Sequence, residues 1–406
     1  MALSGDVLLS VEAAQALAID GLQRLGSERV GLADALDRVI AAEVTSAVDA
    51  PAWPNSAMDG YAVRAGDGTR LHLVGESAAG APLARSIGPG EAAAIMTGAV
   101  VPDGADAVVM VEDTERDGDW VTIRVAPRVG QHIRQVGEDL RTGQVIAVAG
   151  STIGPAELGL LAAARRGAVT VARRPIVAIV STGDELRELD EPLGPGDIAD
   201  SNSLMLAALV QRAGGVPLRL PLVGDDRDAL RAALSEAASA DLVVSTGGVS
   251  VGAHDHVKEV VASLGGVLTA WRVDMKPGKP VAFARLGQTP FFGLPGNPVS
   301  SFVAFWLFVR PALRALLGAR QPFDLPKVQV RLLQGIRSPV ERRHYVRATV
   351  AVDAAGSLTA LPMSRQGSHQ LTSAAGANAL VVVPAHTELV SGGLVDALVF
   401  APISAT

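Results

Sequence analysis

The chain has 406 residues, too many for one ordinary domain, because a domain usually holds about 150 residues. Its 49% apolar and 19% charged residues are typical of a folded protein, and the net charge of -7 excludes a general nucleic-acid surface, which needs basic residues to replace phosphate counterions. The absence of cysteine excludes disulfides, thiolate metal sites and cysteine nucleophiles; it fits a reducing, cytoplasmic location.

The N-terminal segment predicts a helix with Ser10 as its cap. Asp6 and Glu12 stand where a secretory signal would need positive charge and an unbroken apolar stretch. The most apolar run elsewhere, "VSSFVAFWLFV", stops at Arg310 and Pro311, short of the roughly 20 residues of a membrane span. We therefore expect no association with a membrane. The apolar face of the N-terminal helix is expected to contain Val11, Ala14, Ala18, Leu22 and Leu25.

Four parts follow along the chain. Residues 46–140 contain short β-like runs between Gly, Pro and Asp turns, which predicts a small β module. This module is inserted into a helical linker and dimerisation region, residues 1–45 and 141–174, where Pro155 suits a first helical turn.

Residues 175–322 alternate buried apolar runs with helical stretches, which is typical of a doubly wound α/β domain. In its last helix, Asn297 is the expected cap and Pro298 the first residue. Residues 323–406 contain only short strands and predict a C-terminal β barrel. The expected fold class is multidomain α/β plus β.

Polar loops follow three strands of the predicted parallel sheet: "STGDEL" (181–186), "VGDD" (223–226) and "STGGVSVGAHD" (245–255). Ligands of such sheets bind outside the carboxyl ends of the strands, where the strand order reverses. Gly247 and Gly248 allow successive backbone N–H groups to face one anion, so a phosphate is the expected ligand. The loop has neither the dinucleotide nor the P-loop spacing. The alternative is that these glycines form only a strand-to-helix turn.

Five carboxylates of these loops would meet if the strands are neighbours, and hard oxygen ligands suit Mg²⁺. Taken singly, each is instead a helix cap or a solvated acid. "DMKPGKP" adds two lysines on a stiff turn, where two ammonium groups would hold an oxyanion, unless the turn is an exposed hairpin. The carboxylates are Asp184, Glu185, Asp225, Asp226 and Asp255, and the lysines are Lys276 and Lys279.

Two basic segments are less informative. His254 and His256 form an H-x-H pair without further spaced ligands, which favours a loop or capping role over a metal site. "RRHYVR" (342–347) alternates along a predicted strand, so its arginines either face solvent or line a cleft.

Nine segments in order resemble one family. They are "NSAMDGYAV", "IMTGAVVPDGADAVVMVED", "IRQVGEDL", "STGDEL", "DSN", "TGGVSVGAHD", "MKPGKP", "GLPGNPVSSFVAF" and "SRQGSHQLTSAAGANALVVVP". Together they are similar to the molybdopterin molybdenumtransferases, the MoeA and gephyrin E-domain family, from about residue 30 to the C-terminus.

The resemblance implies a reaction. Members of the family take adenylylated molybdopterin and molybdate as substrates, insert the metal at the dithiolene with Mg²⁺ present, and release AMP and molybdenum cofactor. It also implies an elongated homodimer whose active site lies in the α/β domain and is completed by the partner's β module. The molybdopterin adenylyltransferase and apo-molybdoenzymes are the further partners that it implies.

The resemblance also implies roles for individual residues. Asp59 resembles the acid that reaches into the neighbouring subunit, and Gly60 is expected to permit the turn that presents it. Catalytic roles fall on Asp59, Glu185, Asp225, Asp255, Lys276 and Lys279, with Asp225 and Asp226 both open for one position. Metal binding falls on Asp184, Glu185, Asp226 and Asp255. Substrate binding falls on Thr97, Asp139, Ser181, Thr182, Gly183, Asp200, Ser201, Asn202, Thr246, Gly247, Gly248, Ser250, Gly252, Pro295, Gly296, Asn297, Pro298 and Ser368.

The sequence departs from the family pattern in two places. Trp53 and Pro54 stand where the family often has Phe-Asp, and His369 stands where a small residue is common. Both bear on substrate contacts more than on the reaction.

Two other functions compete with the enzyme reading. One is the molybdopterin adenylyltransferase, a single small domain with a "TGGTG" loop, which "TGGVSVG" within a four-part chain disfavours. The other is a non-catalytic dimeric scaffold of the gephyrin kind, which would not need the acids and lysines retained here.

Overall fold

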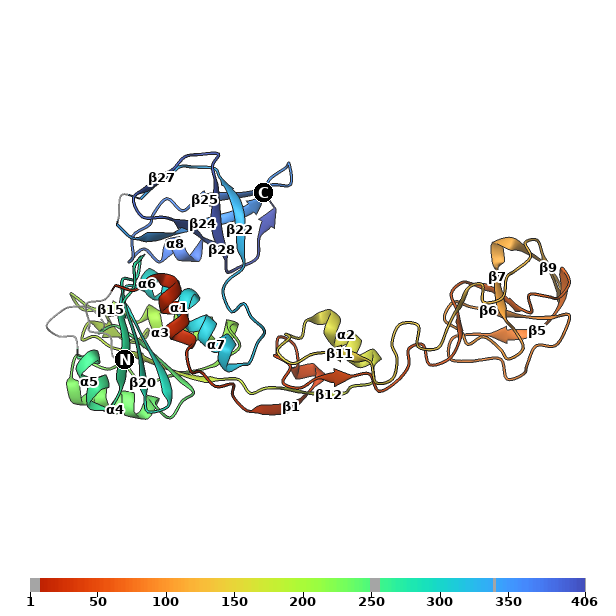
Figure 1. Cartoon of the computed structure of the whole chain (residues 1–406), viewed down its shortest axis with the longest axis horizontal. Coiled ribbons are helices and arrows are strands. Elements are labelled where there is room, and N and C mark those ends of the chain that lie inside the picture. The colour runs from red at the N-terminus through yellow and green to blue at the C-terminus, as the bar shows by residue number, and fades with distance from the viewer. Residues whose placement is uncertain (1–7, 249–255, 339–340, 406) are drawn as a thin grey trace.

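The computed structural model describes residues 8–248, 256–338 and 341–405. The chain is elongated, with the α/β domain and the C-terminal barrel at one end and the β module at the other (Figure 1). The linker region lies between them. The predicted fold class, α/β plus additional β domains with a C-terminal barrel, is confirmed.

The α/β domain is built on a six-stranded sheet. The first four strands in space run parallel, the fifth is antiparallel to the fourth, and the sixth is antiparallel to the fifth. The strand order reverses at the second strand in space, which comes first along the chain. In spatial order they are β16 (Val216–Arg219), β13 (Ile176–Ser181), β17 (Leu242–Thr246), β21 (Thr289–Leu294), β20 (Pro280–Leu286) and β18 (Val267–Arg272).

Helices cover both faces of this sheet, so its central strands are buried on both sides, as their unbroken apolar runs predict. One core contains α3 (Ser201–Arg212), α6 (Pro298–Ala304) and α7 (Arg310–Leu316), and the other contains α4 (Arg227–Ala237) and α5 (Val257–Ser263).

The apolar run from Pro298 does not stop at Arg310 and Pro311 as expected. A π-helical segment, η3 (Phe305–Val309), joins α6 to α7, and a π-helical turn changes the hydrogen-bond register just before a proline that has no N–H to donate. The carbonyl of Leu307, four residues before Pro311, accepts a hydrogen bond from Gln15 Nε2 at 3.3 Å instead. This helix, Pro298–Leu316, is long and apolar enough to cross a membrane, but 83% of its apolar stretch is buried inside the protein.

The N-terminal helix also differs from expectation. α1 (Val11–Ile19) begins at the expected cap, Ser10, whose hydroxyl accepts from the backbone N–H of Ala13, but it ends before Leu22 and Leu25. It packs against η3 and α7, so it belongs to the α/β domain and not to the linker region. Leu22 and Leu25 still pack on the same core, which explains their apolar character.

The linker consists of the two chain segments that enter and leave the β module. β1 (Ser27–Gly31) pairs antiparallel with β12 (Ala168–Ala172), and β2 (Val44–Thr45) pairs with β11 (Val145–Ala147). The helix of this linker, α2 (Pro155–Ala163), begins at the expected proline.

The β module contains a six-stranded sheet in which Gly60 begins a strand and does not form a turn. A Cβ at Gly60 would lie 1.9 Å from the carbonyl oxygen of Val109, so glycine is required for close approach of two strands and not for a positive φ. The strand order is β7 (Ala107–Met110), β4 (Gly60–Val63), β6 (Glu91–Ile95), β5 (Arg70–Ser77), β9 (Trp120–Ile123) and β8 (Thr114–Asp117).

Five strands close the C-terminal barrel, because the first and last of them also pair with each other. In order they are β24 (Arg343–Val352), β25 (Leu358–Pro362), β22 (Lys327–Leu332), β28 (Leu394–Val399) and β26 (Ala379–Val383). A short strand of the α/β domain, β19 (Met275–Lys276), pairs with β24 in parallel and joins the two domains.

Candidate active site

A cavity of about 720 Å³ lies at the carboxyl ends of β13, β17 and β21, the predicted edge of the sheet. Fourteen of the predicted site residues line it, although they come from widely separated segments. They are Thr182, Gly183, Glu185, Asp200, Ser201, Asn202, Asp225, Thr246, Gly247, Gly248, Pro295, Gly296, Asn297 and Pro298. Ser181 is buried at the end of β13 and does not reach the cavity wall.

Gly247 is required by the geometry of the loop after β17. Its φ of +92° lies in the left-handed region, and a Cβ there would lie 2.4 Å from the carbonyl oxygen of Thr182. The backbone of this loop therefore passes directly over the end of β13. Ser250, Gly252, His254 and Asp255, which continue the same motif, lie outside the described residues.

Several polar atoms around the cavity are buried without a hydrogen-bond partner among the residues that the structure describes. Asn202 donates from Nδ2 to Thr246 Oγ1 at 2.8 Å and to the carbonyl oxygen of Gly296 at 2.7 Å, which leaves its Oδ1 unpaired. Asp200 caps α3 through Oδ1, which accepts from the backbone N–H of Ser203 at 3.0 Å, and its Oδ2 is unpaired. Thr182 Oγ1 is also unpaired. Buried polar atoms are normally hydrogen-bonded, so this set indicates a polar ligand.

The predicted acids separate into two groups. Glu185 and Asp225 line the cavity. Asp184 Oδ1 accepts from the backbone N–H of Asp225 at 2.8 Å, and Asp226 Oδ1 accepts from the backbone N–H of Ala229 at 2.7 Å, which makes Asp226 the N-cap of α4. Between the two residues left open by the sequence, the geometry favours Asp225 as the acid of the cavity.

The described carboxylates do not form a complete metal site. No group of three or more His, Asp or Glu side chains in residues 8–248, 256–338 and 341–405 is arranged to hold a metal ion by itself. Mg²⁺ commonly uses one or two protein carboxylates and takes its other ligands from water and substrate phosphates. Glu185 and Asp225 fit that requirement. His256 stands at the N-cap position of α5 without a side-chain capping bond.

The two predicted lysines lie on the segment that directly precedes Pro280, a residue of the cavity wall. Neither lines the cavity, but Pro280, which directly follows Lys279, does. Lys276 is half-buried in β19, opposite His344 of β24. Among the described residues, no carboxylate forms an ion pair with Lys276 or Lys279.

Two residues near these lysines were not predicted. Burial, together with the positive charges of Lys276 and Arg347, lowers the pKa of His344 to about 4. Arg347 is fully buried, its Nη1 has no hydrogen-bond partner in the described part of the chain, and burial lowers its pKa to about 10. The sequence left open whether the arginines of "RRHYVR" face solvent or a cleft; alternation along a strand cannot distinguish a barrel interior from a solvent face.

A loop of the barrel completes the cavity on one side. Ser368, a predicted site residue, accepts through its carbonyl oxygen from the backbone N–H of Val299 in α6 at 3.0 Å. The next residue, His369, lines the cavity itself. The sequence marked His369 only as a departure from the family pattern.

Asp59 directly precedes β4 and Thr97 follows β6, so both lie in the β module, at the opposite end of the chain from the cavity (Figure 1), whereas Asp139 lies where the linker joins the module, next to the bridge between Ala50 and Leu140. Asp59 is fully exposed, and its Oδ1 accepts from the backbone N–H of Thr97 at 2.6 Å, which holds the pKa of the carboxyl below its usual value. Asp139 is exposed and Trp53 is 66% exposed. A single chain therefore does not bring these side chains to the cavity.

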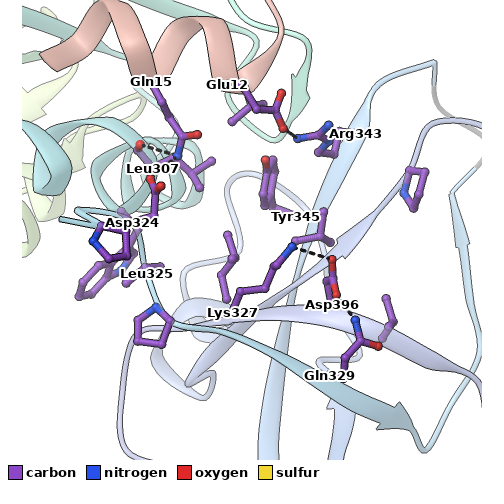
Figure 2. Close-up of a pocket in the computed structure, with 18 of the residues that line it drawn as sticks. Glu12, Gln15, Leu307, Asp324, Leu325, Lys327, Gln329, Arg343, Tyr345 and Asp396 are labelled. Carbon is purple, nitrogen blue, oxygen red and sulfur yellow. Dashed lines mark hydrogen bonds and ion pairs between the residues drawn. The ribbon is translucent and has the colours of Figure 1, made fainter. Parts of the chain in front are cut away.

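A second and larger cavity, of about 1170 Å³, lies between α1, η3 and the barrel (Figure 2). Its polar side chains are mostly paired with each other: Glu12 with Arg343, Lys327 with Asp396 at 3.4 Å, and Gln15 with Asp324 at 3.0 Å. It contains none of the predicted site residues. Size alone does not identify the functional cavity.

Three family models match consecutive parts of the chain. The MoeA N-terminal region (domain I and II) matches residues 9–164, the probable molybdopterin binding domain matches residues 178–315, and the MoeA C-terminal region (domain IV) matches residues 329–400. A molybdopterin molybdenumtransferase of Nostoc sp. is 40% identical over 383 residues, which cover 90% of this chain and 87% of the relative. The chain belongs to the molybdopterin molybdenumtransferase family.

Other members of the molybdopterin molybdenumtransferase family agree with this assignment. The enzyme of Bacillus subtilis is 36% identical over 89% of this chain and 86% of its own length. The crystal structure of the molybdopterin biosynthesis moeA protein from Pyrococcus horikoshii OT3 has a TM-score of 0.83 at 29% identity and covers 97% of this chain and 100% of that one. The family is one of enzymes of molybdenum cofactor biosynthesis.

Proposed function

We propose that this protein inserts molybdate into adenylylated molybdopterin in the presence of Mg²⁺ and releases AMP and molybdenum cofactor. The observation that carries the proposal is the 720 Å³ cavity, where Asp200, Asn202 and Thr182 each present an unpaired buried polar atom beside the Gly247 loop. The family assignment supplies the reaction class, and the polar cavity supplies a site of suitable chemistry. The protein is expected to act in the cytoplasm.

The phosphates of the substrate are the expected ligands of the glycine loop. Gly247 and Gly248 both have positive φ, and successive backbone N–H groups in such a loop stabilise a bound anion. Glu185 and Asp225 are the residues that would hold Mg²⁺, and the ion would supply positive charge to offset the negative charge of the phosphates when an oxygen of water or molybdate attacks the phosphoanhydride. The unpaired atoms of Asn202 and Thr182 are suited to orient polar groups of the same ligand by hydrogen bonds.

Molybdate is the expected ligand of the cationic side chains beside the cavity. Lys276, Lys279 and Arg347 have no carboxylate partner among the described residues, and uncompensated cations beside a cavity favour an oxyanion. The sulfurs that receive the metal belong to the substrate. A chain without cysteine offers no thiolate of its own to compete for molybdenum.

A second copy of the chain is the expected source of Asp59. Its carboxylate is held in one position by Thr97, is fully exposed, and lies far from the cavity of its own chain. In a homodimer the β module of one subunit would bring Asp59 to the cavity of the other. The adenylyltransferase that supplies the substrate and the apo-enzymes that receive the product are the expected transient partners.

The first experiment measures AMP release from adenylylated molybdopterin with Mg²⁺ and a low molybdate concentration, followed by activation of an apo-molybdoenzyme. Molybdate-dependent release of AMP is expected. If AMP release is absent or independent of molybdate at adequate protein concentration, the proposed reaction is wrong. ATP consumption with free molybdopterin would instead identify an adenylyltransferase, and binding without either reaction would identify a scaffold.

The second experiment tests the shared site. Asp59→Asn and Glu185→Gln proteins are each expected to be inactive, and their mixture should recover about a quarter of wild-type activity, because about half of the exchanged dimers are heterodimers with one intact site each. Purified heterodimers marked with two different tags verify the exchange. Inactive heterodimers would mean that Asp59 does not act across subunits.

A further inference from the structure

His369 is the one barrel residue among the described residues that line the 720 Å³ cavity. It is exposed, and its ring shares this cavity with Gly247, Gly248 and the carboxylates Glu185 and Asp225. The barrel therefore reaches the site through a side chain that can donate a hydrogen bond, and not only through packing against the α/β domain.

The loop that carries His369 is held in place from several directions. The backbone N–H of Gly367 donates to Gln370 Oε1 at 2.9 Å, and Gln366 Nε2 donates to the carbonyl oxygens of Met363 at 2.8 Å and Arg347 at 2.9 Å. The bond from Val299 to Ser368 ties the loop to α6 across the domain boundary. His369 is thus presented by a pre-organised loop, which lowers the entropy lost when its ring contacts a ligand.

The chemistry of the cavity indicates which part of a ligand faces this ring. The Gly247–Gly248 backbone favours an anion, whereas Glu185 and Asp225 repel one unless a cation lies between. An imidazole N–H is a donor to phosphate oxygen whether the ring is neutral or charged.

We propose that His369 donates a hydrogen bond to a phosphate oxygen of the adenylylated substrate and so is a substrate-binding residue contributed by the C-terminal barrel. This inference rests on the proposed function, because it places the phosphoanhydride in the same cavity. It assigns to the barrel a direct part in substrate affinity.

Titration calorimetry on the full-length protein with Mg²⁺ tests the contact, with inorganic pyrophosphate and AMP as separate probes. His369→Ala is expected to weaken pyrophosphate binding roughly tenfold, as loss of one hydrogen bond to a charged group would. His369→Gln keeps an N–H donor of similar reach and should stay within about threefold of wild type. His386→Asn, on an exposed barrel turn outside the cavity, is the matched control and should bind as wild type does.

Steady-state kinetics distinguish a direct contact between His369 and the substrate from a purely structural role of His369. In AMP release, His369→Ala should raise the KM for adenylylated molybdopterin roughly tenfold and change kcat by less than about threefold, because the lost bond is made in ground state and transition state alike. Equal pyrophosphate binding and equal KM in wild type and His369→Ala would overturn the inference and leave the proposed function intact. A wild-type protein that binds neither probe and releases no AMP would overturn the proposed function itself.

Discussion

The two large cavities of this chain differ in how their polar groups are satisfied. The 1170 Å³ cavity under the barrel is bordered by side chains that pair with each other, such as Glu12 with Arg343 and Lys327 with Asp396. The smaller cavity at the sheet edge presents unpaired buried atoms of Asn202, Asp200 and Thr182. Buried polar groups without partners are costly unless a ligand completes them. Polar atoms without hydrogen-bond partners therefore locate the site, and cavity volume does not.

Removing a carboxylate charge from the smaller cavity should have the largest effect on activity, and the same change in the larger cavity should have almost none. Glu185→Gln and Asp225→Asn keep the shape of the side chain but remove its charge, and each should lower molybdate-dependent AMP release by roughly 100-fold or more. The matched change in the other cavity, Asp396→Asn, should leave the rate within about twofold. A Glu185→Gln protein with more than half of wild-type activity would contradict the assignment of the smaller cavity.

The second effect concerns the seam where β19 joins the barrel. His344 remains neutral in the folded protein down to about pH 4, whereas the unfolded chain binds the proton near its ordinary value of about 6.5. The unfolded state therefore binds more protons in this window, so stability decreases as the pH falls from about 6.5 to 4, by up to about 3 kcal/mol from this group.

Calorimetric unfolding at several pH values measures this dependence. A His344→Gln protein should show a shallower decrease of the barrel transition temperature between pH 6.5 and 4 than wild type. Identical slopes for the two proteins would mean that His344 is not held neutral by burial and by its cationic neighbours.

The third prediction concerns Gln15, a residue of the larger cavity that we expect to contribute to stability and not to activity. Gln15→Ala removes the donor to the carbonyl oxygen of Leu307 and should lower the free energy of unfolding by about 1–2 kcal/mol without changing activity. In a Pro311→Ala background residue 311 regains an N–H, so the same change should cost less. Urea unfolding of the four proteins measures the difference; equal costs in both backgrounds would refute the link between Gln15 and Pro311.

The smallest effect concerns the ion pair of Lys327 and Asp396, whose side chains are 64% and 35% exposed. A double-mutant cycle with Lys327→Met and Asp396→Asn should give a coupling free energy below about 1 kcal/mol, and added salt should decrease it. A coupling above about 2 kcal/mol would show that the pair is more strongly desolvated than its exposure indicates.

The linear order of motifs was enough to predict the α/β alternation and the cavity edge. Thr182 and Asp225 follow strands and Thr246 is the last residue of one, and parallel strands place their carboxyl ends on one edge whatever the intervening helices are. The N-terminal helix was predicted correctly to start after Ser10 but too long, because Leu22 and Leu25 pack on the core without being helical. A periodic pattern of apolar residues indicates which side chains are buried, but residues in non-helical segments can be buried at the same spacing.

Other features could not be predicted from the local sequence pattern, because they depend on contacts between distant segments. His344 and Arg347 lie three residues apart on β24 and so on opposite faces of the strand, yet both are buried: the face of His344 is covered by the barrel core, which contains Val346, and the face of Arg347 is covered on the side of Tyr345, which packs on the core of the α/β domain. The carbonyl oxygen of Leu307, four residues before Pro311, accepts a hydrogen bond from Gln15, which is almost 300 residues away in the sequence.

The amino-acid sequence was sufficient to predict most helices and strands, the family, and the glycines and acids at the sheet edge. These features depend on local conformational limits and on short motifs in their order along the chain. Tertiary structure alone decided which acid caps a helix and which faces the cavity, that His369 of the barrel reaches the site, and that Asp59 does not reach the cavity of its own chain. Those facts depend on distances between segments that are far apart in the sequence. Such distances are set by the packing of the domains and cannot be derived from the order of residues along the chain.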